Sequence, residues 1–194
     1  MARHSRFMSI NDFRSSFLNI EKDLETILKM LFETSVPFSD DLKRLLVINN
    51  KDCLDKTNQK YTDKIDSMSL ADLIDQNYVK TNPKLEFGDH EEVKAYILIE
   101  FNNFSPTSNP QFRDCVIDFN IFCHTDHWDI GDYQLRPVKI MGYIDGILNN
   151  AKLSGIGTLQ FMGANEIILD ENLSGYLLRY AATHGSDDST PNEE

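Results

Sequence analysis

The 194-residue sequence has no apolar run near the roughly 20 residues that a membrane-spanning helix requires. Its basic N-terminus is not followed by an apolar segment, so we expect no secretory leader and no membrane association. Cysteines are few. Cys53, Cys115 and Cys123 form an odd set at uninformative spacings, which predicts reduced thiols in a cytosol instead of a disulfide framework.

Basic residues are also in short supply, with 19 lysines and arginines against 31 aspartates and glutamates and a formal net charge of −12. This balance disfavours a protein held on nucleic acid or on an anionic membrane, because both surfaces require a basic face. Hydrophobic residues make up 41% of the chain and charged residues 26%, which is ordinary globular usage. Composition therefore predicts an acidic globular protein that folds without a metal or a disulfide.

Hydrophobic patterning divides the chain into four parts. The first, residues 1–33, contains an amphipathic helix over about 12–32, because apolar residues recur there at every third or fourth position. The third, residues 92–184, is predicted to be an α+β core. The fourth, residues 185–194, is an acidic tail without the apolar residues that a packed structure needs.

The second part, residues 34–91, is predicted to be an insertion into this core. Two short helices are expected over about 40–47 and 70–75, the second with Ser69 as its N-cap. The intervening residues 51–67 are nearly all polar and are expected to form an irregular surface excursion. Long loops of this kind are uncommon in compact domains and are often functional or ordered by a partner.

The core is expected to contain an antiparallel sheet of about four strands, packed by the long N-terminal helix and one internal helix. Apolar and polar residues alternate over 93–102 and over 115–124, which is the period of strands with one wet face. Proline in the first turn supports a helix over 137–150. Two closing strands are predicted over 156–162 and 175–183.

Residues 124–129 (His-Thr-Asp-His-Trp-Asp) carry the most chemically versatile side chains of the chain. Imidazoles and carboxylates bind transition metals, so His124, Asp126 and His127 are candidate ligands, with the acidic group around His90 as a further source. Their spacing does not place both histidines on one helix face, and a solvated polar loop is the simpler interpretation. A metal-dependent hydrolase or nuclease centred on this loop is the alternative function.

Trp128 is the only tryptophan and lies among polar residues. Such a residue either plugs the space beneath a helix or anchors an interface. Gly155 and Gly157 match half of a dinucleotide fingerprint but precede a strand, and the sequence contains no P-loop, nucleophile elbow or HExxH motif. The sequence thus predicts no catalytic residue, no cofactor and no enzyme activity.

Residues from about Lys94 to Thr183 resemble the tail-terminator (tail-completion, head–tail joining) proteins of tailed bacteriophages. The resemblance rests on the segments CVIDFNIFCHTDHW, RPVKIMGYIDGILNN, GIGTLQFMGANEIIL and LSGYLLRYAATHG. They follow the family's order of an apolar strand broken by polar residues, a polar loop, an amphipathic helix and two closing strands, the last opened by Gly175 and Tyr176. The N-terminal helix also fits this layout, whereas the insertion and the acidic tail depart from it.

The resemblance implies a structural virion protein. Such proteins form a ring, typically a homohexamer, in the neck, where the ring caps the tail tube and meets the head connector or adaptor. DNA passes through the lumen without sequence-specific binding, which suits an acidic chain because negative charge repels the phosphates. The implied partners are copies of the chain itself, the tail tube protein and the head connector. The protein would be made in the host cytoplasm and reside at the head–tail junction.

A closed ring of identical subunits needs two different complementary patches on each subunit. We expect one patch on the loop over 124–136 and the other on the insertion. The candidate contact residues are Trp128, Asp129, Tyr133, Arg136, Lys43 and Arg44. A small cytosolic interaction module unrelated to virions is the third interpretation of this sequence.

Overall fold

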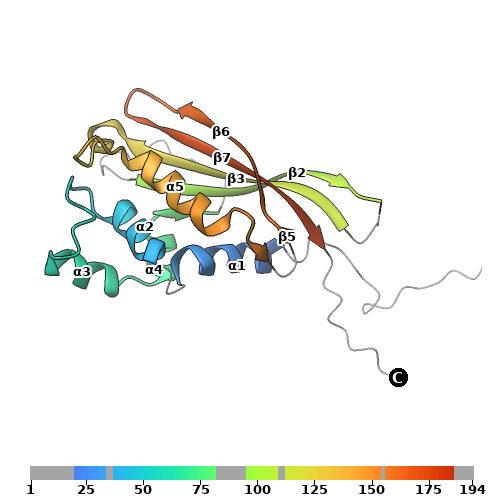
Figure 1. Cartoon of the computed structure of the whole chain (residues 1–194), viewed down its shortest axis with the longest axis horizontal. Coiled ribbons are helices and arrows are strands. Elements are labelled where there is room, and N and C mark those ends of the chain that lie inside the picture. The colour runs from blue at the N-terminus through green and yellow to red at the C-terminus, as the bar shows by residue number, and fades with distance from the viewer. Residues whose placement is uncertain (1–19, 34–36, 82–94, 109–111, 154–155, 186–194) are drawn as a thin grey trace, which may run out of the picture.

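The computed structural model describes residues 20–33, 37–81, 95–108, 112–153 and 156–185. The first part of the predicted N-terminal helix, the acidic group around His90 and the acidic tail after Gly185 lie outside these residues. The described residues form two layers: a strongly curved sheet, and helices that all lie against one of its faces (Figure 1). The chain is therefore α+β, as the sequence predicts.

The main sheet has five strands in the order β1–β2–β3–β7–β6. Four of them are antiparallel to their neighbours: β2 (Ala95–Pro106), β3 (Phe112–His124), β6 (Gln160–Ile168) and β7 (Leu173–Gly185). The fifth, β1 (Val79–Lys80), pairs in parallel with β2. This short strand comes from the predicted insertion and raises the expected four strands to five.

A second, two-stranded sheet consists of β4 (Lys152–Leu153) and β5 (Gly157–Thr158). It corrects one predicted boundary, because the strand expected over 156–162 is split in two. The first residues of the predicted strand form β5 and pair with β4, whereas β6 begins only at Gln160. Gly157 has φ +77 at this point, a conformation that glycine adopts without a steric penalty.

Five helices are described: α1 (Ile20–Phe32), α2 (Pro37–Val47), α3 (Gln59–Asp66), α4 (Leu70–Asp75) and α5 (Arg136–Leu148). The helices expected over 40–47, 70–75 and 137–150 are confirmed, and Ser69 caps α4 in a capping box with Asp72. The irregular excursion expected over 51–67 is wrong in its second half. There, Tyr61 and Ile65 lie four residues apart and give α3 one apolar side among polar residues.

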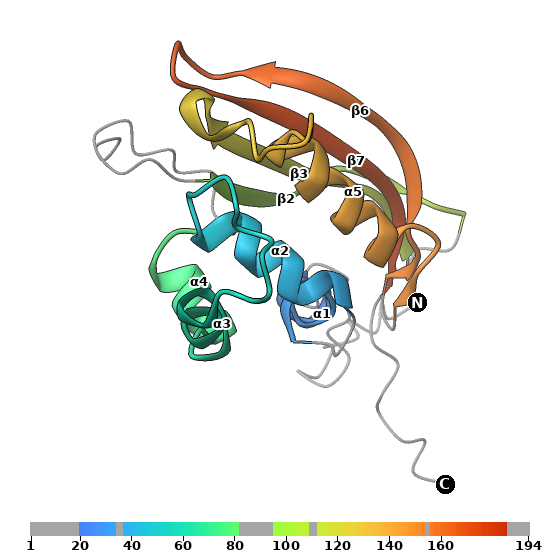
Figure 2. The same cartoon turned by 60° about the vertical axis from the view of Figure 1, so that its left-hand side comes forward.

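One hydrophobic core joins the sheet to the helices. The inner face of β3 buries Ile117, Phe119 and Ile121 completely. Figure 2 shows α5 and α2 between the sheet and the outer helices, and both bury fully covered side chains in the same core. The helices of the predicted insertion therefore pack against the sheet as part of one unit. None of the described helices is long and apolar enough to cross a membrane.

Candidate interaction surfaces

The loop between β3 and α5 carries most of the predicted site residues. It begins with a single 3-10 turn, Thr125–His127, where the Nδ1 atom of His124 accepts a hydrogen bond from the amide of Asp126 at 3.3 Å. Further along, Gly131, Asp132 and Tyr133 all have positive φ, at 85°, 50° and 61°. This tight, strained turn leaves the Tyr133 side chain fully exposed to solvent.

The two histidines of this loop make separate contacts. His127 places its Nδ1 atom 2.7 Å from the carbonyl oxygen of Asn49, whereas the Nδ1 atom of His124 is engaged with the turn. The two imidazole centroids are 6.2 Å apart, and Asp126 reaches only to 3.7 Å from His124. Within the described ranges, no group of three or more histidine, cysteine or acidic side chains is arranged to hold a metal ion.

Trp128 packs inward against the hydrophobic core. Its Nε1 atom donates a hydrogen bond to the carbonyl oxygen of Cys123 at 3.3 Å, and its ring centroid lies 6.3 Å from that of Tyr176. Of the two interpretations of this residue, the structure favours a side chain that fills space in the interior over an interface anchor. Tyr133, five residues later, is the most exposed large apolar side chain of this loop, and Leu135 beside it is also exposed.

Arg136 is completely buried, so it belongs to the interior and not to an exposed patch. The last carbonyl groups of a helix lack partners inside the helix, and the guanidinium fork can satisfy several of them. Here it spans the end of α2 and the start of the following segment. Its hydrogen-bond acceptors are the carbonyl oxygens of Leu45, Ile48, Asn49, Asn50 and His127.

Arg44 is likewise buried, which removes it from the expected surface patch. Its side chain pairs with Asp40 at 2.9 Å and donates to the hydroxyl of Thr62 at 2.9 Å, and so ties α2 to α3. The neighbouring Lys43 is half-buried, with its Nζ atom 3.3 Å from the carbonyl oxygen of Met68. Neither member of this basic pair is a freely exposed cation.

Asp129 is exposed and forms an ion pair with Lys51 at 2.5 Å. The hydrogen bond from Lys51, together with one from the amide of Gly131, lowers the pKa of the Asp129 carboxyl. This contact links the loop to the segment after α2. Of the six predicted contact residues, Asp129 and Tyr133 are thus the two whose side chains lie at the surface.

A further surface was not singled out from the sequence. The edge strand β6 exposes Phe161, Met162 and Ile168, with 47%, 55% and 74% of their surfaces accessible. The available signal was the segment QFMGANEII itself, whose apolar residues do not alternate strictly as they do in a strand with one buried face.

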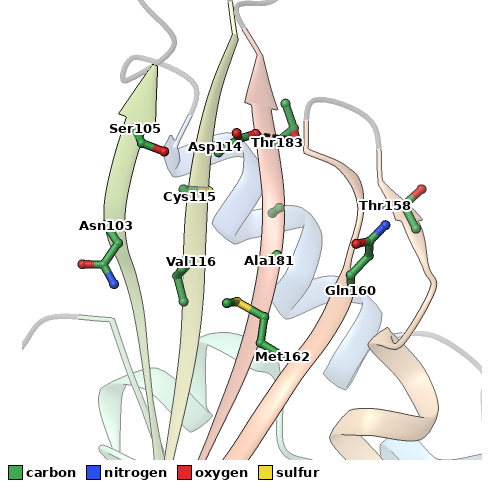
Figure 3. A pocket seen from close by; sticks show the side chains of 11 residues that line it. Asn103, Ser105, Asp114, Cys115, Val116, Thr158, Gln160, Met162, Ala181 and Thr183 are labelled. Carbon is green, nitrogen blue, oxygen red and sulfur yellow. Dashed lines mark hydrogen bonds between the residues drawn. The ribbon is translucent and has the colours of Figure 1, made fainter. Parts of the chain in front are cut away.

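A hollow of about 370 Å³ opens at the end of the sheet and is lined by residues of β2, β3, β7, β6 and β5 (Figure 3). Two of its lining residues on adjacent strands are bonded to each other, with the Thr183 hydroxyl donating to the Asp114 carboxylate at 2.9 Å. Burial raises the pKa of the Cys115 thiol there to about 11, so this thiol is protonated and weakly nucleophilic near neutral pH. The Cys115 thiol is therefore not an activated nucleophile.

The comparisons with known proteins add one finding. The model of the YomW family matches residues 39–182, from α2 to nearly the end of β7. No curated protein matches the chain. The match includes most of the predicted insertion together with nearly all of the main sheet, so both belong to the pattern of this family. The chain is a member of the YomW family, whose name derives from a prophage.

Proposed function

We propose that this protein is a structural virion component that forms a ring at the head–tail junction of a tailed phage. In this position it caps the tail tube and joins it to the head connector. The observation that carries the proposal is the exposure of large apolar side chains on β6 and at Tyr133 in a chain whose helices fill a well-formed core. Exposed apolar surface of this kind marks contacts with other proteins.

Two further properties support a place in the virion. The first is the phage-derived family to which the chain belongs. The second is its net charge of −12, which opposes binding to DNA that must pass through the ring. The described basic side chains Arg44 and Arg136 are buried and bound, so they do not offset this repulsion at the surface.

The turn at Tyr133 is a contact site for a neighbouring protein of the junction in this proposal. Residues other than glycine held at positive φ cost on the order of 1–3 kcal/mol each, and such strain concentrates at binding sites. Asp132 and Tyr133 both carry it, and together they present the tyrosine ring to solvent. Trp128 holds this loop against the protein through its packing on the hydrophobic core.

The first experiment is electron microscopy of particles made after deletion of this gene. Full heads beside separate tails, especially tails of uncontrolled length, are the expected result, and complementation with the wild-type gene restores joined particles. Complementation with Tyr133→Ala is expected to reduce joining while the purified variant stays folded. Trp128→Ala is a poorer probe because it also removes core contacts. Normal joined particles in the deletion strain would refute the neck function.

The alternative of a metal-dependent hydrolase receives no specific support from the loop geometry, because no group of three or more histidine, cysteine or acidic side chains among the described residues is arranged to hold a metal ion. Metal analysis of the purified protein tests it directly. A stoichiometric transition metal that is lost in a His127→Ala variant would favour the enzyme over the structural role.

A further inference from the structure

The open edges of the main sheet point to the way in which subunits join. We infer that β6 of one copy pairs with the free edge of β2 in the next copy, so that the sheets continue from subunit to subunit. This inference rests on the proposed ring and names the surface that closes it. The partner is a second copy of the same chain.

Both outer edges of the sheet have unused pairing capacity among the described strands. β6 pairs only with β7. On the opposite side, β1 pairs with just Ile97 and Leu98, which leaves residues 99–106 of β2 without a described strand beside them. An open edge presents unpaired N–H and C=O groups that readily accept another strand.

Apart from a bulge between Phe161 and Gly163 near its start, the edge of β6 lacks the usual protection against pairing. Natural edges are blunted by lysine, by proline or by inward-pointing charge. The nine residues of β6, QFMGANEII, contain no lysine or proline and a single charged residue, Glu166. Three large apolar side chains on this strand are exposed as well. This combination fits a strand that is covered in the assembled protein.

The strand directions make head-to-tail pairing possible. β2, β3, β7 and β6 alternate in direction, and they are even in number (Figure 1). If copies are related by a rotation that preserves the strand direction, β2 of the next copy lies antiparallel to β6. The strand directions then keep alternating across the contact between two copies, as a heterologous ring contact of antiparallel strands requires.

The two edges also match in length, and one cation of β1 lies near an acidic residue that follows β6. The free part of β2 spans 99–106, nearly the length of the nine-residue β6, and each strand has one irregularity, between Asn102 and Ser105 in β2 and between Phe161 and Gly163 in β6. Pro106 at the end of β2 has no N–H group to donate.

Antiparallel pairing sets the end of β6 beside residue 99, next to Lys80 at the end of β1. The turn that follows β6 contains the exposed Glu171. Glu171 of one copy thus lies near Lys80 of the next, where the adjacent carboxylate of Glu100 accepts a hydrogen bond from Asn120 at 2.8 Å. Phe101 and Phe104 of β2 are half-buried and pack against the core of their own copy.

A two-fold contact between two copies of β6 is the competing arrangement. It would also be antiparallel, but it would bring the Glu166 and Glu171 side chains of the two copies onto one contact that has no lysine from β6. It would also stop at a dimer and leave the edge of β2 unused. Head-to-tail pairing uses both edges.

Chemical cross-linking tests the arrangement in the full-length protein. The double variant Ala164→Cys/Ser105→Cys places one thiol on each edge, and a short bis-maleimide is expected to give a ladder of dimers, trimers and larger species. A mixture of the two single variants is expected to stop at dimers, and neither single variant alone should cross-link. The native cysteines are buried, so the wild-type chain is the blank. Cross-linking by Ala164→Cys alone would overturn the inference in favour of the two-fold contact.

The same reaction on purified particles separates this inference from the proposed function. Joined particles that need the gene but give no ladder would overturn edge pairing and leave the neck function intact. If the protein gave a cross-linked ladder but deletion of its gene left the particles normal, edge pairing would stand and the neck function would be refuted. Absence of a ladder both in particles and in the concentrated protein would refute edge pairing.

A matched pair of charged substitutions gives an independent test. Ala164 on β6 and Ala71 on α4 are both exposed. Ala164→Lys puts a cation on the proposed contact between copies and is expected to lower the oligomeric fraction, measured by native mass spectrometry, at least tenfold. Its circular dichroism spectrum should remain that of the wild type. Ala71→Lys should assemble as the wild type does. Equal assembly of both variants would contradict the proposed interface.

Discussion

Arg179 on β7 holds Asp118 on β3 with two hydrogen bonds, from Nε to Oδ1 at 2.8 Å and from Nη2 to Oδ2 at 3.1 Å. Asp118 alternates along β3 with Ile117 and Phe119, which face the helices, so the pair lies on the opposite face of the sheet. Only 7% of the Asp118 side chain is exposed, and Asn102 on β2 donates a further hydrogen bond to it at 3.2 Å. One carboxylate therefore ties three strands together and is neutralised where it is buried.

Arg179→Met is expected to destabilise the fold by leaving this carboxylate with a single neutral donor. A broken buried ion pair costs several kcal/mol, but Arg179 is partly exposed, so we expect a loss of about 2 kcal/mol. Urea denaturation measures the change. Lys152→Met, which removes an exposed cation on β4, should change the unfolding free energy by less than about 0.5 kcal/mol. Similar effects of the two variants would contradict this role for Arg179.

Arg136→Met is expected to cost more, about 3 kcal/mol, because it leaves several buried carbonyl oxygens at the end of α2 without donors. Arg136→Lys should recover part of the loss, since an ammonium group carries three donors against five. Lys139→Met on the same helix is the control. Thermal and urea unfolding would refute the role if Arg136→Met behaved like that control.

The sequence predicts those elements that local patterns define. Ser69 marks the start of α4, Pro137 marks the first turn of α5, and apolar residues at every second position from Cys115 to Cys123 mark β3. The strand β1 is not predicted because two residues are too few to show an alternation of apolar and polar side chains. They form a strand only because they pair with the edge of β2. The helix α3 is not predicted because its residues are mostly polar and just one of them is buried.

The candidate site is predicted less completely than the fold, because exposure depends on distant parts of the chain. Charged residues are usually at the surface. Arg136 is buried only because carbonyl groups up to 91 residues away need its donors. Conversely, the apolar residues of β6 look like core residues. Their exposure follows from the position of β6 at the edge of the sheet, which sequence patterns do not reveal.

Thiol reactivity gives a prediction with a defined pH dependence. Burial raises the pKa of Cys115 to about 11 and that of Cys123 to about 12, and it also raises the pKa of Cys53. At pH 8 an aromatic disulfide reagent should label none of the three thiols quickly in the folded protein and all three in denaturant. Rapid labelling of one thiol under native conditions would show that this thiol is accessible to solvent and not buried.

The same shifts predict a loss of stability at alkaline pH. The unfolded chain ionises its thiols near their ordinary pKa of 9, whereas the folded chain keeps Cys115 and Cys123 protonated to higher pH. Their contribution is therefore fully present below pH 9 and is lost as the pH rises through 11 to 12. Cys123→Ala should flatten this part of the profile of unfolding free energy against pH. An unchanged profile would assign the alkaline loss to other groups.

Gly175 and Gly163 provide a test of backbone packing within the sheet. A Cβ atom added at Gly175 would collide with the carbonyl oxygen of Ile121 and lie 3.3 Å from Cα of Phe122. These are backbone atoms of the adjacent strand β3, so the clash cannot be relieved by a change of rotamer. Gly175→Ala is therefore expected to cost about 3 kcal/mol. At Gly163, in the bulge of β6, an added Cβ atom meets nothing within 4 Å.

Gly163→Ala is consequently expected to be neutral or to stabilise the fold by up to about 1 kcal/mol, because alanine restricts the unfolded chain more than glycine does. Both substitutions add one methyl group to neighbouring paired strands, so the difference between them isolates the close approach at Gly175. Urea unfolding of the two variants and the wild type measures it. If Gly175→Ala were as stable as Gly163→Ala, the contact between β7 and β3 would be looser than described, and the register of the central strand pair would need revision.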